Sequence, residues 1–161
     1  MNSLTVALFG HREIEDLRLL EHRLVPIVSE LLRENAYVCF LIGRNGEFDE
    51  YAASVIKGVQ RQHGKECCEL SLVLPYTVSD IQYYEKYYDS IIIPECVYRT
   101  HPKAAITLRN RWMIEQSDLI IFYVQNQKGG AYSSMKYAEK LNKQRINLFS
   151  SGVQSERRLP V

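Results

Sequence analysis

Six short apolar runs, separated by longer polar or helix-patterned segments, constrain the fold of this chain more than any other feature. In each run nearly every position is apolar, which is typical of strands buried on both faces of a sheet. The runs are residues 4–9, 37–42, 70–74, 91–93, 118–124 and 146–149. Because right-handed crossovers join such strands, the alternation predicts an α/β fold: a doubly wound, mostly parallel sheet of about six strands with helices on both faces.

The rest of the sequence predicts one domain without a membrane span. The 161 residues suffice for one hydrophobic core, and no linker or low-complexity tract interrupts them. We therefore expect a single domain over residues 1–149 and a polar C-terminal tail over residues 150–161. No apolar run approaches the ~20 residues that cross a bilayer, and residues 1–10 show no signal-peptide pattern.

The cysteines and the charges bear on the compartment and the partners. Cys39, Cys67, Cys68 and Cys96 form no C-x-x-C pair and have no histidine at zinc-finger spacing, which predicts no metal site and a reducing, cytoplasmic location. Lys and Arg number 20 and Asp and Glu 19, a net charge of +1. This near-balance predicts that nucleic acid is an unlikely partner, while a local basic pocket for a small anion stays open.

The loops that follow the strands are the expected ligand site, because ligands of open parallel sheets bind beyond the carboxyl ends of the strands. These loops gather glycines, arginines and side chains that form hydrogen bonds at residues 10–12, 43–49, 75–77 and 125–130. The predicted ligand-binding residues are Gly10, His11, Arg12, Gly43, Arg44, Asn45, Gly46, Arg109, Gly129, Gly130, Ala131 and Ser133.

Gly129 and Gly130 precede a predicted helix and offer the most specific anion site. A helix start without bulky side chains presents free N–H groups and a positive dipole end, and the Ser133 hydroxyl adds a donor. The segment is neither a P-loop nor a G-x-G-x-x-G dinucleotide motif. A glycine turn with ordinary capping is the alternative.

The charged residues near these loops have two readings each. Arg109 and Arg44 offer planar guanidinium groups that suit a phosphate, or they lie on solvated faces. His11 binds a ligand or caps the next turn. Glu47 and Asp49 are the weak catalytic candidates, although Asp49 can equally cap the following helix.

The tyrosines Tyr83, Tyr84, Tyr87 and Tyr88 form the only compositional bias. Tyrosine is enriched at protein interfaces, so the segment predicts cover for a sheet edge or a contact in a homo-oligomer. A surface on which bases stack is the second reading.

These motifs together resemble the SLOG superfamily of Rossmann-like proteins, which includes the DNA-processing protein DprA and the LOG phosphoribohydrolases. Within it, the chain resembles small bacterial members related to the YpsA-like group. The resemblance lies in residues 6–12, 43–49, 109–113, 117–121 and 129–131. It implies a Rossmann-like fold and a nucleotide or nucleotide-derived small molecule as ligand. We predict no cofactor.

The resemblance also bears on catalysis. LOG enzymes cleave a base from a nucleoside monophosphate with an arginine, which Arg109 matches, and a glutamate after the Gly-Gly turn. Ser133, Ser134 and Lys136 follow that turn here, so the glutamate is missing. We therefore expect binding without an evident acid–base pair. The alternative is an N-glycosidic hydrolase or ribosyltransferase, with Asp49 or Glu47 as the carboxylate.

Overall fold

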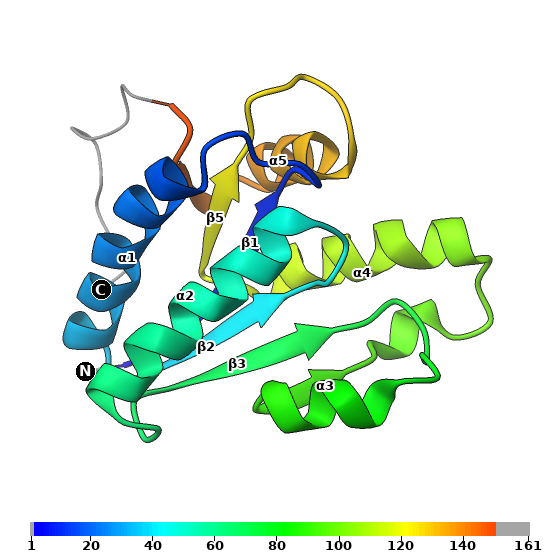
Figure 1. The fold of residues 1–161 in the computed structure, drawn as a ribbon. Helices are drawn as coiled ribbons and strands as arrows, with labels where there is room; N and C mark the ends of the chain where they lie inside the picture. Colours follow the sequence, from blue (N-terminus) through cyan, green and yellow to red (C-terminus); the bar gives the residue numbers. More distant parts are fainter. Residues whose placement is uncertain (1, 151–161) are drawn as a thin grey trace.

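The computed structural model describes residues 2–150, which form one six-stranded sheet (Figure 1). The strands lie in the order β4-β3-β2-β1-β5-β6, and every neighbouring pair is parallel. They are β1 (Ser3–Gly10), β2 (Tyr37–Ile42), β3 (Cys68–Val73), β4 (Ser90–Ile92), β5 (Leu119–Tyr123) and β6 (Gln144–Asn147). The predicted doubly wound α/β fold is confirmed.

Helices cover both faces of this sheet. In Figure 1, α1 (Leu17–Glu34) and α2 (Glu47–His63) lie in front of it, and α4 (Pro102–Gln116) and α5 (Gly130–Lys140) lie behind. A short helix, α3 (Ile81–Tyr87), and a 3-10 turn at Glu95–Val97 flank the β4 edge. Side chains of β1 alternate between the two layers, since Val6 and Leu8 pack with α1 and α2 while Ala7 and Phe9 pack with α4 and α5. Burial on both faces explains why the strand sequence is apolar throughout.

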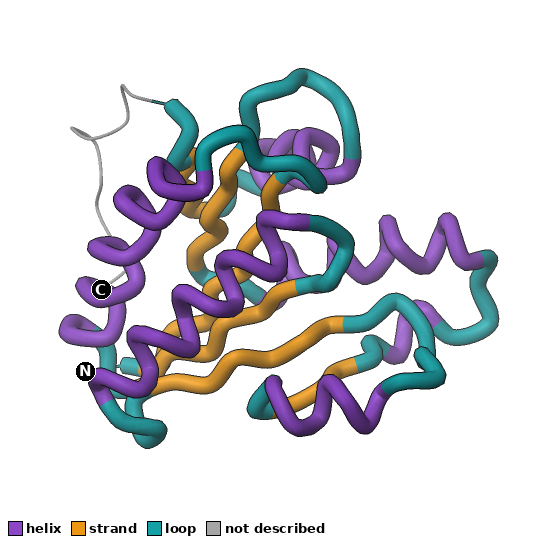
Figure 2. The backbone as a smooth tube through the Cα atoms, in the orientation of Figure 1, coloured by secondary structure: helices purple, strands orange, loops and turns teal. Residues whose placement is uncertain are grey.

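The chain reverses its direction of winding beside β1, and this reversal places the site. β1 pairs with β2 on one side and with β5 on the other, with Gly10 opposite Tyr123. The crossovers on the two sides of β1 cover opposite faces, which leaves a crevice outside the carboxyl ends of these strands. Figure 2 shows the loops after β1, β2 and β5 gathered at that end of the sheet.

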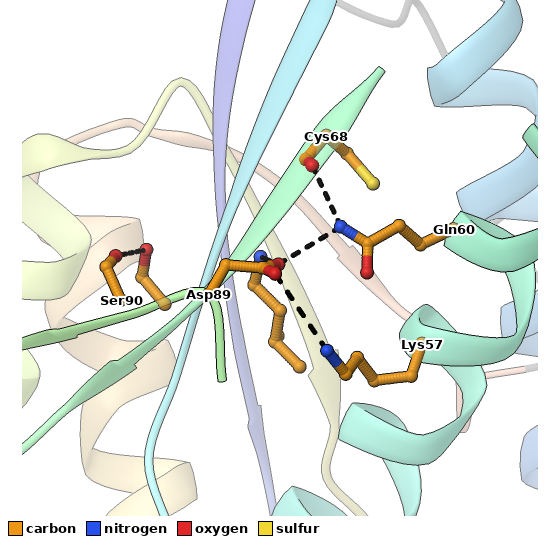
Figure 3. Close-up of polar contacts among 7 residues, drawn as sticks. Lys57, Gln60, Cys68, Asp89 and Ser90 are labelled. Carbon is orange, nitrogen blue, oxygen red and sulfur yellow. Dashed lines mark hydrogen bonds and ion pairs between the residues drawn. The ribbon is translucent and has the colours of Figure 1, made fainter. Parts of the chain in front are cut away.

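A polar network fastens the short edge strand β4 to its neighbours (Figure 3). The Asp89 carboxylate accepts hydrogen bonds from the Leu70 amide at 2.7 Å and from Gln60 Nε2 at 3.1 Å. Its other oxygen lies 3.9 Å from Lys57 Nζ. One side chain therefore joins the start of β4 to β3 and to α2.

No helix within residues 2–150 is long and apolar enough to cross a membrane. Of the predicted polar tail, residues 150–161, only Ser150 belongs to the described part of the chain, and residues 151–161 lie outside it.

Candidate ligand-binding cleft

A cleft of about 420 Å³ opens at the carboxyl end of the sheet, between the loops after β1 and β2, the middle of α4 and the start of α5. Most of the predicted ligand-binding residues line it. They are Gly10, His11, Arg12, Gly43, Asn45, Arg109, Gly129, Gly130 and Ala131. Segments that are far apart in the sequence thus meet around one space, and the chemistry of that space depends on a few polar groups.

Arg109 is the principal charged group of the cleft. It is only 2% exposed, and Nη1 donates to the Val73 carbonyl at 2.8 Å while Nε donates to Asn110 Oδ1 at 2.8 Å. Burial lowers the pKa of the guanidinium, partly offset by the charge of Asp49. Within residues 2–150 Nη2 forms no hydrogen bond, and no buried side-chain nitrogen there lacks a partner, so Nη2 is open to the cleft and available to a ligand.

Asp49 faces the same space from the first turn of α2. Its Oδ2 accepts from the Asn45 amide at 2.8 Å. Burial raises the pKa of Asp49 to about 6, against the opposing effects of that hydrogen bond and of Arg109. A Cβ placed on Gly43 would lie 3.0 Å from Arg109 Nη1 and 3.3 Å from Asp49 Oδ2. Glycine at position 43 therefore lets both charged groups approach the end of β2.

The start of α5 supplies further donors. Gly129 has φ 95°, in the left-handed region that favours glycine, and no side chain in the described part of the chain caps the helix. A Cβ at Gly129 or Gly130 would meet no atom within 4 Å, so these glycines border open space. The N–H groups of the first turn and the positive end of the helix dipole thus face the cleft.

His11 bridges two loops at the rim of the cleft. Its Nε2 accepts hydrogen bonds from the amides of Gln125, at 2.9 Å, and Asn126, at 3.0 Å. Burial lowers the pKa of His11, and an accepting Nε2 requires the neutral ring with its proton on Nδ1. Of the two readings from the sequence, the geometry favours a residue that holds the loop after β5.

Three predicted ligand-binding residues do not line the cleft. The Arg44 guanidinium turns toward α3, where it donates to Tyr84 Oη at 3.3 Å and lies 5.3 Å from the centre of that ring. Gly46 packs on the backbone of Arg12, because a Cβ there would come within 2.4 Å of Arg12 Cα. Ser133 is exposed on α5, beyond the first turn that borders the cleft.

The two carboxylate candidates also separate. Glu47 accepts from the Ile14 amide at 2.9 Å and stabilises the loop before α1. It does not line the cleft, whereas Asp49 does. Both lie in the first turn of α2, which begins at Glu47 and not at the first apolar residue, because acidic side chains are favourable at a helix start.

Sequence reasoning missed part of the α4 wall, namely Ile106, Asn110 and Met113. Asn110 matters most, since its side chain holds Nε of Arg109. The helical spacing of Ile106, Asn110 and Met113 around Arg109 was the available signal. Among residues 2–150 no group of three or more His, Cys, Asp or Glu side chains could hold a metal ion.

Comparison with known proteins gives a likeness in structure alone. No family model matches the chain, and no curated protein matches it in sequence. The structure of DNA processing protein A (DprA) from Streptococcus pneumoniae superposes with a TM-score of 0.65 at 14% identity, over 94% of this chain and 52% of that one. DprA from Helicobacter pylori, whose structure is described for its single-stranded DNA binding mode, gives 0.58 at 20% identity, over 88% and 63%.

These likenesses correct one prediction. The near-neutral charge led us to expect nucleic acid as an unlikely partner, and this was wrong as an argument, because a protein of the same fold binds single-stranded DNA. Net charge averages over the whole surface, whereas phosphate contacts depend on a local group of donors. The chain spans 52% and 63% of the lengths of these two proteins. Over that span it has the Rossmann-like fold of DprA, the fold that the resemblance to the SLOG superfamily implied.

Proposed function

We propose that the cleft binds a nucleotide through its phosphate. The observation that carries this proposal is the convergence of two kinds of donor on one space. Arg109 is buried with Nη2 unpaired by the described residues, and the uncapped first turn of α5 faces the same cleft. An oriented guanidinium and free helix amides together suit a phosphate.

The rest of the cleft suits the remainder of a nucleotide. Leu8, Phe9 and Met113 provide apolar wall, and Asn45 lies at the rim as a polar group for a sugar or base. The nucleotide is either a free metabolite or one residue of single-stranded DNA. The second source is favoured by the described DNA binding of the Helicobacter pylori protein of the same fold.

Calorimetric titration separates these sources. Nucleoside monophosphates, cyclic dinucleotides and ADP-ribose form one arm, and a 5′-phosphorylated oligothymidylate forms the other. Saturable binding in either arm supports the site, and no binding at millimolar concentration in both arms contradicts it.

A matched variant tests the position of the phosphate. Ala131 lines the cleft in the first turn of α5, where Asp is favourable to the helix. Ala131→Asp should therefore keep the fold but place a negative charge against the phosphate and abolish binding. Arg111→Gln, an exposed arginine of α4 that lies over Tyr137, is the control and should bind as the wild type does.

Asp49 favours a second candidate function at the same site, cleavage of the N-glycosidic bond. Its raised pKa near 6 lets the carboxyl exchange a proton close to neutral pH, beside the guanidinium that would hold the phosphate. Water would attack the sugar carbon as the bond to the base breaks, and Asp49 would accept the proton of the water. The departing base would keep the electron pair of the broken bond and take up a proton from solvent. Chromatography of nucleoside monophosphates after incubation detects the free base, and release that persists in Asp49→Asn rejects this role.

A further inference from the structure

A second cavity, of about 270 Å³, adjoins the nucleotide cleft at His11. Its walls come from the loop before α1, the first turn of α1, the end of β5 and Phe149. Three carboxylates border it, those of Glu13, Glu15 and Asp16. The side chains around this cavity therefore carry negative charge. The cleft on the other side of His11 instead presents hydrogen-bond donors that suit an anion.

The hydroxyl of Tyr123 has no hydrogen-bond partner among the described residues around this cavity. The residue is 5% exposed and lines the cavity, yet its hydroxyl forms no hydrogen bond within residues 2–150. Burial raises the pKa of Tyr123, the charge of Arg23 lowers it, and Asp16 and Glu15 raise it, so these charges lie near the phenol. Every buried side-chain nitrogen and oxygen in residues 2–150 has a hydrogen-bond partner, so the unpaired Tyr123 hydroxyl is one that solvent reaches, and an occupant of the cavity can bond to it.

The aromatic walls are rigid and suit a cation with an apolar body. Phe149 meets Tyr123 edge to face, with ring centres 5.5 Å apart and planes at 83°. Arg23 donates to the Leu148 and Phe149 carbonyls at 2.6 and 3.1 Å, so it holds this wall and does not line the cavity. Leu19 adds apolar surface. Aromatic faces and nearby carboxylates both attract a positive charge.

We propose that this cavity is a binding site for an organic cation, an ammonium or guanidinium group carried on an apolar body. The cation lies among the carboxylates of Glu15 and Asp16 and donates to the Tyr123 hydroxyl, and the apolar body packs on Phe149 and Leu19. The site shares only His11 with the nucleotide cleft. A test of cation binding is therefore independent of the proposed nucleotide binding.

Phenethylamine is the probe, and 2-phenylethanol is its neutral counterpart. Both are titrated into ¹⁵N-labelled full-length protein, and the shifts of the Gln125 and Asn126 amides, which line the cavity, are followed by NMR. The amine should give saturable shifts at these amides, and the alcohol should bind at least about fivefold more weakly.

Three conservative variants test the assignment. Glu15→Gln and Asp16→Asn should each weaken binding by about fivefold, and Asn keeps the cap that Asp16 gives to the Leu19 amide. Tyr123→Phe should weaken it by about twofold to tenfold. Glu34→Gln, at the far end of α1, is the control and should bind as the wild type does. Absent shifts, equal binding of the alcohol, or variants that all bind like the control would each overturn the proposal.

Discussion

At the scale of single residues, the site depends on charged groups that the fold has taken out of water. Arg109 could be predicted as a site residue from its motif and its place before the strongest strand, and the cleft does contain it. Arg44 could not be placed in the same way, because the sequence does not show which neighbour its side chain meets in the fold. The side chain settles on Tyr84, which supplies an aromatic face and a hydroxyl.

The raised pKa of Asp49 predicts that the stability of the fold depends on pH. Its folded-state pKa is about 6 against 3.8 in the unfolded chain, so the folded state holds more protons between these values and loses stability as the pH rises through them. Asp49→Asn stays neutral and can still accept from the Asn45 amide. The stability of the variant relative to the wild type should therefore rise by about 1 kcal/mol between pH 5 and pH 7.5.

Urea unfolding at a series of pH values measures this difference. Glu85→Gln, an exposed carboxylate of α3 that does not act on the pKa of Asp49, is the control. A difference between Asp49→Asn and wild type that is flat across this range would mean that the carboxyl is not buried as described.

Substitution of two glycines by alanine should change the stability of the fold in opposite directions. A Cβ on Gly10 would lie 2.1 Å from Cγ of the buried Phe48, so Gly10→Ala must displace a core ring and should cost about 1–3 kcal/mol. Gly58 lies inside α2, where a Cβ meets no atom within 4 Å, and Gly58→Ala should stabilise by about 0.5–1 kcal/mol. Thermal unfolding compares the two, and a gain in Gly10→Ala would contradict the close approach.

At the scale of elements, the apolar runs predicted the strands well where a strand is buried on both sides. β2 was predicted to the residue, whereas β6 begins at Gln144 and not at Ile146. An edge strand pairs on one side only, so its polar first residues carry no apolar signal. α1 runs unbroken through Pro26, which is exposed.

The other edge strand makes a prediction at this scale. Asp89 links β4 to β3 and α2 through the bonds drawn in Figure 3. Asp89→Ala leaves the Leu70 amide without a partner and should cost about 1–3 kcal/mol. Hydrogen exchange should then show faster opening of β4 than of β1. Asp80→Ala, before α3, is the control, since the Asp80 side chain makes no cap bond, and equal exchange in the two variants would contradict the anchoring role.

At the scale of the whole molecule, topology could be predicted and surface chemistry could not. The order of apolar runs fixes a doubly wound sheet, and the sheet fixes where a ligand binds. Composition gives only the sum of the charges, +1 here, and the sum does not show which charges gather beside the cleft. The role of the exposed Tyr83 is also a matter of surface chemistry that the sequence does not settle. Its contact in a homo-oligomer stays a prediction, which light scattering can test.

The small number of cationic groups near the cleft predicts how strongly salt weakens the binding of an oligonucleotide. Close to the cleft the cationic groups are Arg12 and Arg109, with Lys128 in the loop after β5. If a single-stranded oligonucleotide binds there, it contacts about two or three phosphates, and the slope of log K against log salt should be no steeper than about −2. Fluorescence anisotropy of a labelled oligothymidylate between about 50 and 200 mM salt, over which the Debye length falls about twofold, measures this slope. Lys128→Gln should reduce the slope by roughly 0.7, and the exposed Arg33→Gln should not change it.

A slope near −5 would instead require a strand that tracks across the surface beyond the cleft, and would contradict binding of a single nucleotide unit as the main source of affinity.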